Sequence, residues 1–213
     1  LTMVVGNVVA LQQKNLKRLV AYSSIGQVGY MLISIAAIGY GDGAGGVNAT
    51  SGLLIHIIGY VCSTLLLFVA LTAFYNRTRK DNIEDLKGLA ETQPFLALVI
   101  TCALFSFAGL PFFAGFATKL FMLQGAVTDD LIWVVGLAVL NSFISLYYYL
   151  SIVRSMYMRP AAGTGQVAVA GGSPPSDEPI TGAIALCVIV TVGTFFLVGP
   201  LVDLATKAAS SLF

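Results

Sequence analysis

Lys119 is the residue whose position most directly indicates chemistry. It is the only Lys or Arg deep inside an apolar segment, whereas the other ten lie at predicted helix ends or in loops. A charged side chain at the centre of a bilayer costs roughly 2.5 to 3.5 kcal/mol on insertion scales, so such a residue is expected to be functional. Because desolvation disfavours the ammonium form, a buried lysine can take up and release a proton. Proton transfer is therefore the chemistry that we predict for Lys119.

His56 is the second side chain suited to proton transfer, because it is the only histidine and imidazole exchanges protons near neutral pH. Tyr60 and Ser63 follow it at i+4 and i+7, which places all three on one face of a helix. Further polar side chains at helical spacing lie in neighbouring apolar segments, and they are Ser24, Gln27, Asn141 and Ser145. Together these residues predict a proton path that passes between the helices.

Each candidate also has a purely structural alternative. A membrane lysine can extend its amine to the interface, and Lys119 lies only about 12 Å from the outer end of its segment. The polar residues can instead form interhelical hydrogen bonds, which are worth about 0.6 kcal/mol on average. The structural alternative for His56 is a histidine that packs between helices or lies at the membrane interface. The sequence beside Lys119 favours function, since a lysine that reaches the interface does not require the broken helix predicted there.

The composition determines which kind of element must position these groups. The chain is 57% hydrophobic and only 10% charged, and its mean hydropathy is +0.89. A soluble domain has about a quarter of its residues charged, so the composition predicts an all-α integral membrane protein. The net charge of +1 gives no indication of nucleic-acid binding. The three cysteines lie alone in different segments, so no metal site is expected.

Six transmembrane helices are predicted. Spanning a bilayer core requires roughly 20 apolar residues, and five stretches are long enough. The first stretch, 1–13, is too short to cross, and the sequence opens with Leu1, so we expect it to begin inside a helix with a preceding part missing. The predicted spans are 1–13, 19–40, 51–76, 94–127, 131–157 and 180–206.

The fourth span is predicted to be broken. Its 34 residues would make a straight helix of about 50 Å, well beyond the hydrocarbon thickness. Pro111 lacks an amide hydrogen, and Gly109 and Gly115 permit irregular backbone on either side, so the interruption is expected at Gly109-Leu110-Pro111. We predict half-helices at 94–108 and 116–127, with Lys119 in the first turn of the second.

The loop charges predict the orientation, because cytoplasmic loops collect Lys and Arg. Nine of the eleven basic residues fall on one side of a six-span topology, which we assign to the cytoplasm, and the C-terminus is assigned to the outer side. The Gly/Pro/Ser-rich run 160–179 is predicted to be a flexible cytoplasmic linker. It divides an antiporter-like membrane domain, 1–159, from a last transmembrane helix and tail at 180–213.

Four stretches resemble subunit N (the mitochondrial subunit 2 type) of respiratory complex I, the NADH-quinone oxidoreductase. They occur in that family's order, whereas the last span and the linker are similar only in kind. The stretches are NLKRLVAYSSI (15–25), DNIEDLKGL (81–89), AGLP with AGF and the lysine (108–119), and NS with Ser145 and YYYL (141–150). Two positions depart from the family pattern: Phe112 stands where a second proline is usual, and Thr118 where a glycine is common.

The resemblance implies that the chain is the C-terminal part of a 14-helix antiporter-like subunit, covering helices 9 to 14. The family has a lysine in its broken twelfth helix, and the resemblance implies that Lys119 is that lysine, the outer member of a proton relay. The implied partners are the lipid bilayer, the other membrane-arm subunits, neighbouring antiporter-like subunits included, and the missing N-terminal half. NADH, FMN, iron-sulfur clusters and quinone are expected in other subunits, so this chain would carry no cofactor and no redox chemistry.

The predicted function is that of a translocase subunit in a bacterial inner membrane. Quinone reduction elsewhere in the complex would drive proton pumping, with Lys119 as the proton carrier. A subunit of a multisubunit cation/proton antiporter is the alternative, since it shares the broken helix with its lysine. A membrane scaffold without transport is a third possibility, and it would require Lys119 to be replaceable without effect on pumping.

Overall fold

The computed structural model describes residues 1–40, 44–127, 131–158 and 178–212. Within these residues the chain is helical, and one isolated bridge joins Asn15 to Asn82. The helices in chain order are α1 (Thr2–Leu11), α2 (Leu16–Tyr40), α3 (Ala44–Thr78), the 3₁₀ turn η1 (Ile83–Leu86), α4 (Leu89–Thr92), α5 (Pro94–Ala108), α6 (Ala114–Gly125), α7 (Ile132–Tyr157), α8 (Glu178–Phe196) and α9 (Val198–Ser210).

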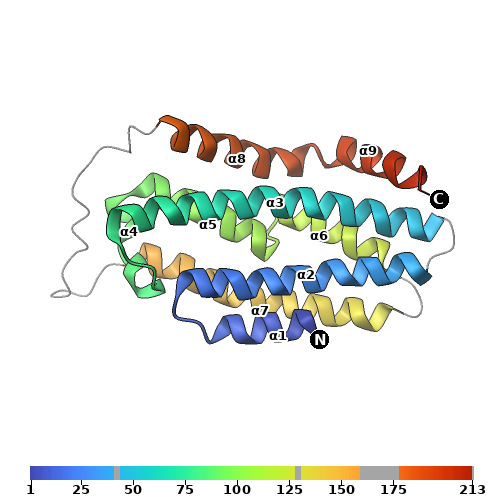
Figure 1. Ribbon diagram of the computed structural model, residues 1–213, viewed down its shortest axis with the longest axis horizontal. Helices are drawn as coiled ribbons and strands as arrows, with labels where there is room; N and C mark the ends of the chain where they lie inside the picture. Colours follow the sequence, from blue (N-terminus) through green and yellow to red (C-terminus); the bar gives the residue numbers. More distant parts are fainter. Residues whose placement is uncertain (41–43, 128–130, 159–177, 213) are drawn as a thin grey trace.

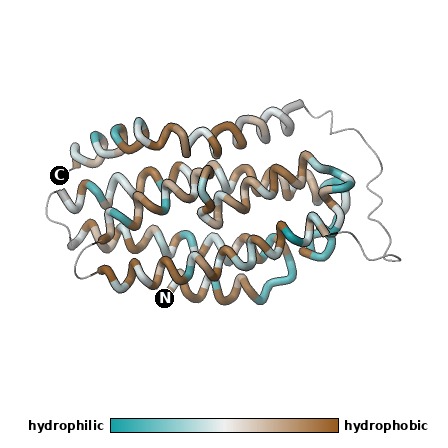
Figure 2. The backbone as a smooth tube through the Cα atoms, turned by 180° about the vertical axis from the view of Figure 1, so that it is seen from behind, coloured by the Kyte–Doolittle hydropathy of each residue, from teal (hydrophilic) through white to brown (hydrophobic). Residues whose placement is uncertain are grey.

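The predicted all-helical membrane class is confirmed. Among the described residues, three helices (α2, α3 and α7) are each long and apolar enough to cross a membrane, and α8 with α9 forms a bent pair that passes the same test. Figure 2 shows that most of the helical backbone carries hydrophobic residues. The fourth predicted span is the broken pair α5 and α6, and the first corresponds to the short apolar helix α1.

The helices form an elongated bundle (Figure 1). α3 lies at its centre and contacts α2, α5, α6, α8 and α9. α1 and α7 pack against each other and against α2. The last two helices lie beside α3, on the side of the bundle away from α1 and α7.

Backbone hydrogen bonds join the basic segments at one end of the bundle. The amide of Leu16 donates to the carbonyl of Asp81, and the amide of Ile83 donates to that of Lys14. Gly88 donates to the carbonyl of Met158 at the end of α7. The α1–α2 turn, the segment between α3 and α5 and the end of α7 therefore share one end, as the six-span topology requires. Most of the predicted linker at 160–179, with Arg159, lies outside the described residues.

The last predicted span is interrupted in the structure. We predicted one helix over 180–206, but α8 ends at Phe196 and α9 begins at Val198, with an angle of 82° between them. Pro200 explains the position of the bend, because its ring would clash with the carbonyl of Phe196 four residues earlier and it has no amide to bond there.

Glycines allow α3 and α6 to approach closely. A Cβ added at Gly52 would lie 2.7 Å from the carbonyl oxygen of Phe121, and one at Gly125 would lie 2.7 Å from that of Asn48. A Cβ at Gly59 would lie 2.8 Å from Cγ2 of Thr118. Small residues at such contacts let membrane helices pack backbone against backbone. Gly52, His56 and Gly59 share one face of α3, so this packing also presses His56 against α6.

Candidate functional site

The predicted break in the fourth span begins where α5 ends at Gly109. Gly109 has a left-handed backbone, with φ 77° and ψ 42°. Its amide donates to the carbonyl of Ser106 at 3.1 Å, and the amide of Leu110 donates to that of Phe105 at 3.0 Å. This is the Schellman arrangement, which ends a helix by turning its last amides back onto its carbonyls. Glycine suits the position because it adopts positive φ without a Cβ penalty.

Because of Pro111, one backbone carbonyl of α5 has no amide partner and can accept a hydrogen bond from a side chain. In a continuing helix, residue 111 would donate its amide to the carbonyl of Phe107, but proline has no amide hydrogen. Nζ of Lys119 donates to that carbonyl instead, at 2.7 Å, and Nε2 of Gln27 donates to it at 3.4 Å. The helix break thus creates the acceptor that holds the buried lysine, whose exposed fraction is 7%.

The second half-helix begins two residues earlier than we predicted. α6 starts at Ala114, not at residue 116, because Oγ of Ser106 accepts the amide of Gly115 at 3.1 Å and so satisfies one of the free donors of its first turn. The prediction that Lys119 lies in the first turn was therefore wrong. It lies in the second turn, two residues further from the positive end of the helix dipole than predicted.

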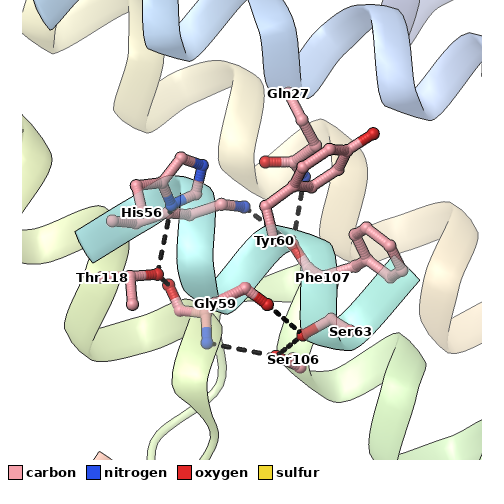
Figure 3. A pocket seen from close by; sticks show the side chains of 10 residues that line it. Gln27, His56, Gly59, Tyr60, Ser63, Ser106, Phe107 and Thr118 are labelled. Carbon is pink, nitrogen blue, oxygen red and sulfur yellow. Dashed lines mark hydrogen bonds between the residues drawn. The ribbon is translucent and has the colours of Figure 1, made fainter. Parts of the chain in front are cut away.

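His56 is held by the residue that precedes the lysine. Its Nδ1 lies 3.1 Å from Oγ1 of Thr118, and both side chains are buried. Thr118 also donates to the carbonyl of Gly115 at 3.5 Å. Figure 3 shows the His56 ring from α3 pointing at the Thr118 hydroxyl on α6.

A serine pair joins α3 to both half-helices. Oγ of Ser63 donates to the carbonyl of Gly59 at 2.8 Å and lies 2.7 Å from Oγ of Ser106. Since the Ser63 hydrogen is used, the Ser106 hydroxyl donates to Ser63 while it accepts the amide of Gly115. The pair therefore ties both sides of the break to α3 (Figure 3).

A small cavity lies among these groups. Its free volume is ≈ 10 Å³, about the space that the centre of one water molecule requires. Two buried polar atoms of its lining residues, Oε1 of Gln27 and Nε2 of His56, have no hydrogen-bond partner among the described residues. The cavity is lined by Gln27, His56, Gly59, Tyr60, Ser63, Ser106, Phe107, Gly115, Thr118 and Lys119. The side chains of Lys119, His56 and Gln27 therefore meet at one small cavity.

A second polar cluster lies beside the first and consists of neutral groups. The Tyr148 hydroxyl donates to Oδ1 of Asn7 at 2.9 Å, and Nδ2 of Asn7 donates to Asn141 at 3.4 Å and to the hydroxyl of Tyr30 at 3.3 Å. Ser142 donates to the same Tyr30 hydroxyl at 3.4 Å. We call this set, which joins α1, α2 and α7, the Asn7 network.

Tyr30 joins the two clusters. Nζ of Lys119 lies 5.1 Å from the centre of the Tyr30 ring, within the range of a cation–π interaction, while the hydroxyl of that ring belongs to the Asn7 network. The ion pairs among the described residues are Lys17 with Asp81 and Lys80 with Asp85, both at the end of the bundle where the basic segments meet. Lys119 is therefore balanced within the described chain by a carbonyl and an aromatic face, without a carboxylate.

The structure brings some predicted residues together and separates others. Lys119, His56 and Gln27 line one cavity, and Gly109, Pro111 and Gly115 form the break beside it. Asn141 belongs to the Asn7 network. Ser24 lies elsewhere and donates to the carbonyl of Val20 in its own helix. Ser145 donates to the carbonyl of Ser142 and lies beside the Asn7 network, since its hydroxyl also interacts with that of Tyr30.

Four participants had not been predicted as site residues. Ser106 caps α6, the Phe107 carbonyl holds the lysine, Tyr30 covers it, and Thr118 contacts His56. The Phe107 carbonyl could have been found from the sequence, since it lies four residues before Pro111 and any such carbonyl loses its amide partner. Ser106 and Tyr30 have no comparable signal, because their roles depend on which helices become neighbours.

A family model supports the sequence resemblance. The transmembrane region described as NADH:quinone oxidoreductase/Mrp antiporter matches residues 1–145. The chain is 34% identical over 218 residues to NADH-quinone oxidoreductase subunit N of Moorella thermoacetica, and 36% identical over 212 residues to that of Heliobacterium modesticaldum. Both alignments cover 100% of this chain and 42% of the relative, so the chain spans about two fifths of the curated relatives' length.

Solved structures share the fold. Respiratory complex I from Thermus thermophilus contains a chain that superimposes with a TM-score of 0.72 at 28% identity, covering 95% of this chain and 43% of that one. The membrane-bound sulfane sulfur reductase, an archaeal respiratory membrane complex, gives 0.81 at 25% identity, with 98% and 40% covered. The Mrp complex from Dietzia gives 0.80 at 22% identity, with 99% and 45% covered, which supports the fold alone.

Proposed function

Because the chain belongs to the NADH:quinone oxidoreductase/Mrp antiporter transmembrane family, we propose that it translocates protons in the membrane arm of an NADH-quinone oxidoreductase. The observation that carries this proposal is the buried Lys119, whose amine donates to a backbone carbonyl freed by the helix break. An ammonium held by a neutral acceptor can lose its proton without leaving a carboxylate unpaired. Lys119 is then the proton carrier, and redox chemistry belongs to other subunits.

The cavity supports proton exchange between Lys119 and His56. Both residues line the same small cavity, and Nε2 of His56 has no partner among the described residues, so it is free to accept a proton. Gln27 lines the same cavity, and its Oε1 is a further acceptor without a partner among the described residues. A proton that leaves Nζ of Lys119 turns the ammonium into a neutral amine and His56 into an imidazolium. The reverse transfer reloads the lysine.

Assembly and orientation follow from the same proposal. Neighbouring membrane-arm subunits, antiporter-like subunits among them, are the proposed partners, and a bacterial plasma membrane is the proposed location. The basic segments that meet at one end of the bundle would face the cytoplasm, and the C-terminus the outer side. Antibody access to a tag at the C-terminus, in intact and in permeabilised spheroplasts, measures that orientation.

Lys119→Ala and Lys119→Arg test the proton carrier. Alanine removes the group, whereas arginine keeps the charge but cannot deprotonate. We expect both variants to lower proton translocation per quinone reduced by at least about tenfold. The measurement is dye quenching in inverted vesicles that contain the assembled complex, alongside its quinone reductase rate. Unchanged pumping in both variants would contradict the mechanism and favour a scaffold.

A cation/proton antiporter is the second candidate. The likeness to the Mrp complex favours it at the level of the fold, whereas the relatives at 34–36% identity carry the name of subunit N. The two candidates differ in their energy source. Proton movement that depends on NADH oxidation and stops with a quinone-site inhibitor supports the first, and sodium-dependent proton movement without NADH supports the second.

A further inference from the structure

Thr118 stands between two features of the site that the proposed function leaves unexplained. Its hydroxyl contacts the His56 ring, and its methyl group fills the space left by Gly59. Thr118 is fully buried, although a hydroxyl at a helix contact is costly to bury without a partner. Its position in the fold therefore suggests a role that depends on the hydroxyl and not only on its volume.

The hydrogen bonds around Thr118 define which nitrogen of His56 carries a hydrogen. A threonine hydroxyl has one hydrogen, and in a helix it commonly donates to the carbonyl three or four residues earlier. The carbonyl of Gly115 takes that place, with its oxygen 3.5 Å from Oγ1. With that hydrogen directed at Gly115, Oγ1 faces Nδ1 of His56 as an acceptor at 3.1 Å, and this arrangement assigns the imidazole hydrogen to Nδ1.

The other ring nitrogen is then left as a proton acceptor. Nε2 is buried, has no partner among the described residues and belongs to a residue that lines the cavity. Lys119 lines the same cavity, and its amine donates to the carbonyl of Phe107, which is also a lining residue. A lone pair on Nε2 is compatible with that donor, whereas an N–H group aimed at an ammonium would be repelled.

We propose that Thr118 is a positioning residue that holds His56 in the Nδ1–H tautomer, so that Nε2 is the acceptor for the proton that Lys119 releases. The inference rests on the proposed function and adds to it. Gly59 is part of the arrangement, because a Cβ there would lie 2.8 Å from Cγ2 of Thr118 and would push the hydroxyl away from the ring.

A matched pair of substitutions separates the hydroxyl from the shape of the side chain. Thr118→Val keeps the volume and removes the hydroxyl, whereas Thr118→Ser keeps the hydroxyl and removes the methyl group. We expect valine to lower proton translocation about tenfold per quinone reduced, the lower end of what is lost when the group fixing a histidine tautomer is removed. Serine should stay within about twofold of the unchanged complex. The opposite ranking would mean that Thr118 only fills space, and it would overturn the proposal.

Dependence on His56 gives a second measurement. If Thr118 acts through the histidine, Thr118→Val should have no further effect in a complex that already carries His56→Gln. Multiplicative losses in the double variant would contradict the proposal.

Gly59→Ala should reduce pumping as Thr118→Val does, whereas Gly45→Ala on the same helix, where an added Cβ meets nothing within 4 Å, should not.

The tautomer can also be observed in the unaltered complex. Nitrogen-15 NMR of histidine-labelled complex, after subtraction of the spectrum of His56→Gln, should show Nδ1 protonated and Nε2 unprotonated in the unchanged complex and in Thr118→Ser. The reverse pattern would overturn the proposal even if Thr118→Val failed to assemble. Lys119→Ala, measured in the same vesicles, distinguishes a failure of the proposed function from a failure of this inference. Unchanged pumping in Lys119→Ala contradicts the proposed function. Lost pumping in Lys119→Ala together with normal pumping in Thr118→Val contradicts only the role of Thr118.

Discussion

The Lys119 cavity and the Asn7 network are two buried polar regions of one bundle, and they differ in what surrounds their hydrogen bonds. The cavity contains a cation, a histidine and two polar atoms without partners among the described residues, and it adjoins a broken helix. The Asn7 network is neutral and joins unbroken helices, and both polar atoms of the Asn7 side chain, Oδ1 and Nδ2, are hydrogen-bonded in it. Satisfied neutral groups hold helices together, whereas unpaired groups around a charge leave a proton free to move.

The largest effect should come from the break itself. A Cβ at Gly115 would overlap the backbone carbonyl of Ser106, so Gly115→Ala must separate the two half-helices. We expect a loss of about 3 kcal/mol or more and little assembled protein in membranes, measured by blotting and by the thermal stability of the detergent-solubilised complex. Gly136→Ala on α7 is the control, since an added Cβ there meets nothing within 4 Å. Normal assembly of the Gly115 variant would show that the half-helices are not locked together.

Asn7→Leu and Gln27→Leu compare the two regions directly. Asn7→Leu leaves the hydroxyl of Tyr148 and its other partners unsatisfied, so we expect a loss of about 1 to 3 kcal/mol in stability but normal pumping per assembled complex. Gln27→Leu removes an unpaired acceptor beside the cavity and a long hydrogen bond to the Phe107 carbonyl, which Lys119 still satisfies, so it should lower pumping with little loss of stability. Thermal inactivation and vesicle pumping measure the two effects. If both variants lost the same property, the distinction between the regions would be wrong.

Tyr30 can be altered so that one region is affected at a time. Tyr30→Phe removes the hydroxyl from the Asn7 network but keeps the ring beside Lys119, so it should cost about 1 kcal/mol of stability and leave pumping unchanged. Tyr30→Leu also removes the aromatic face, worth roughly 0.5 to 2 kcal/mol to a nearby cation, and should lower pumping as well. Equal pumping in the two variants would exclude a role for the ring.

The smallest effects are expected for Ser24→Ala and Ser145→Ala. Both hydroxyls donate to carbonyls of their own helices, and neither residue lines the cavity, while Ser145 also contacts the hydroxyl of Tyr30. Stability and pumping should each stay within the error of the measurement, about 0.5 kcal/mol for stability. A clear loss of pumping in either variant would extend the proton path beyond the cavity that we describe.

Much of the framework was predictable because it depends on local chemistry. The first half-helix was predicted at 94–108 and α5 covers Pro94–Ala108, since proline at its start and glycine after its end act on adjacent backbone. The start of α6 was misplaced by two residues because Ser106, nine residues away from Gly115, caps it. The bend between α8 and α9 had a local cause in Pro200, which the prediction of a continuous last span overlooked.

Hydropathy and composition suffice to show that the chain is a helical membrane protein, that its fourth span is broken and that a single lysine lies beside the break. These features follow from hydropathy and from backbone groups that proline and glycine alter within one turn. Which polar residues meet depends instead on the packing of the helices. That packing placed His56 and Gln27 with Lys119, assigned Asn141 to another network and left Ser24 and Ser145 bonded to their own helices. The reason is that helical periodicity defines a face, whereas the neighbour of that face depends on how closely glycines allow the helices to pack.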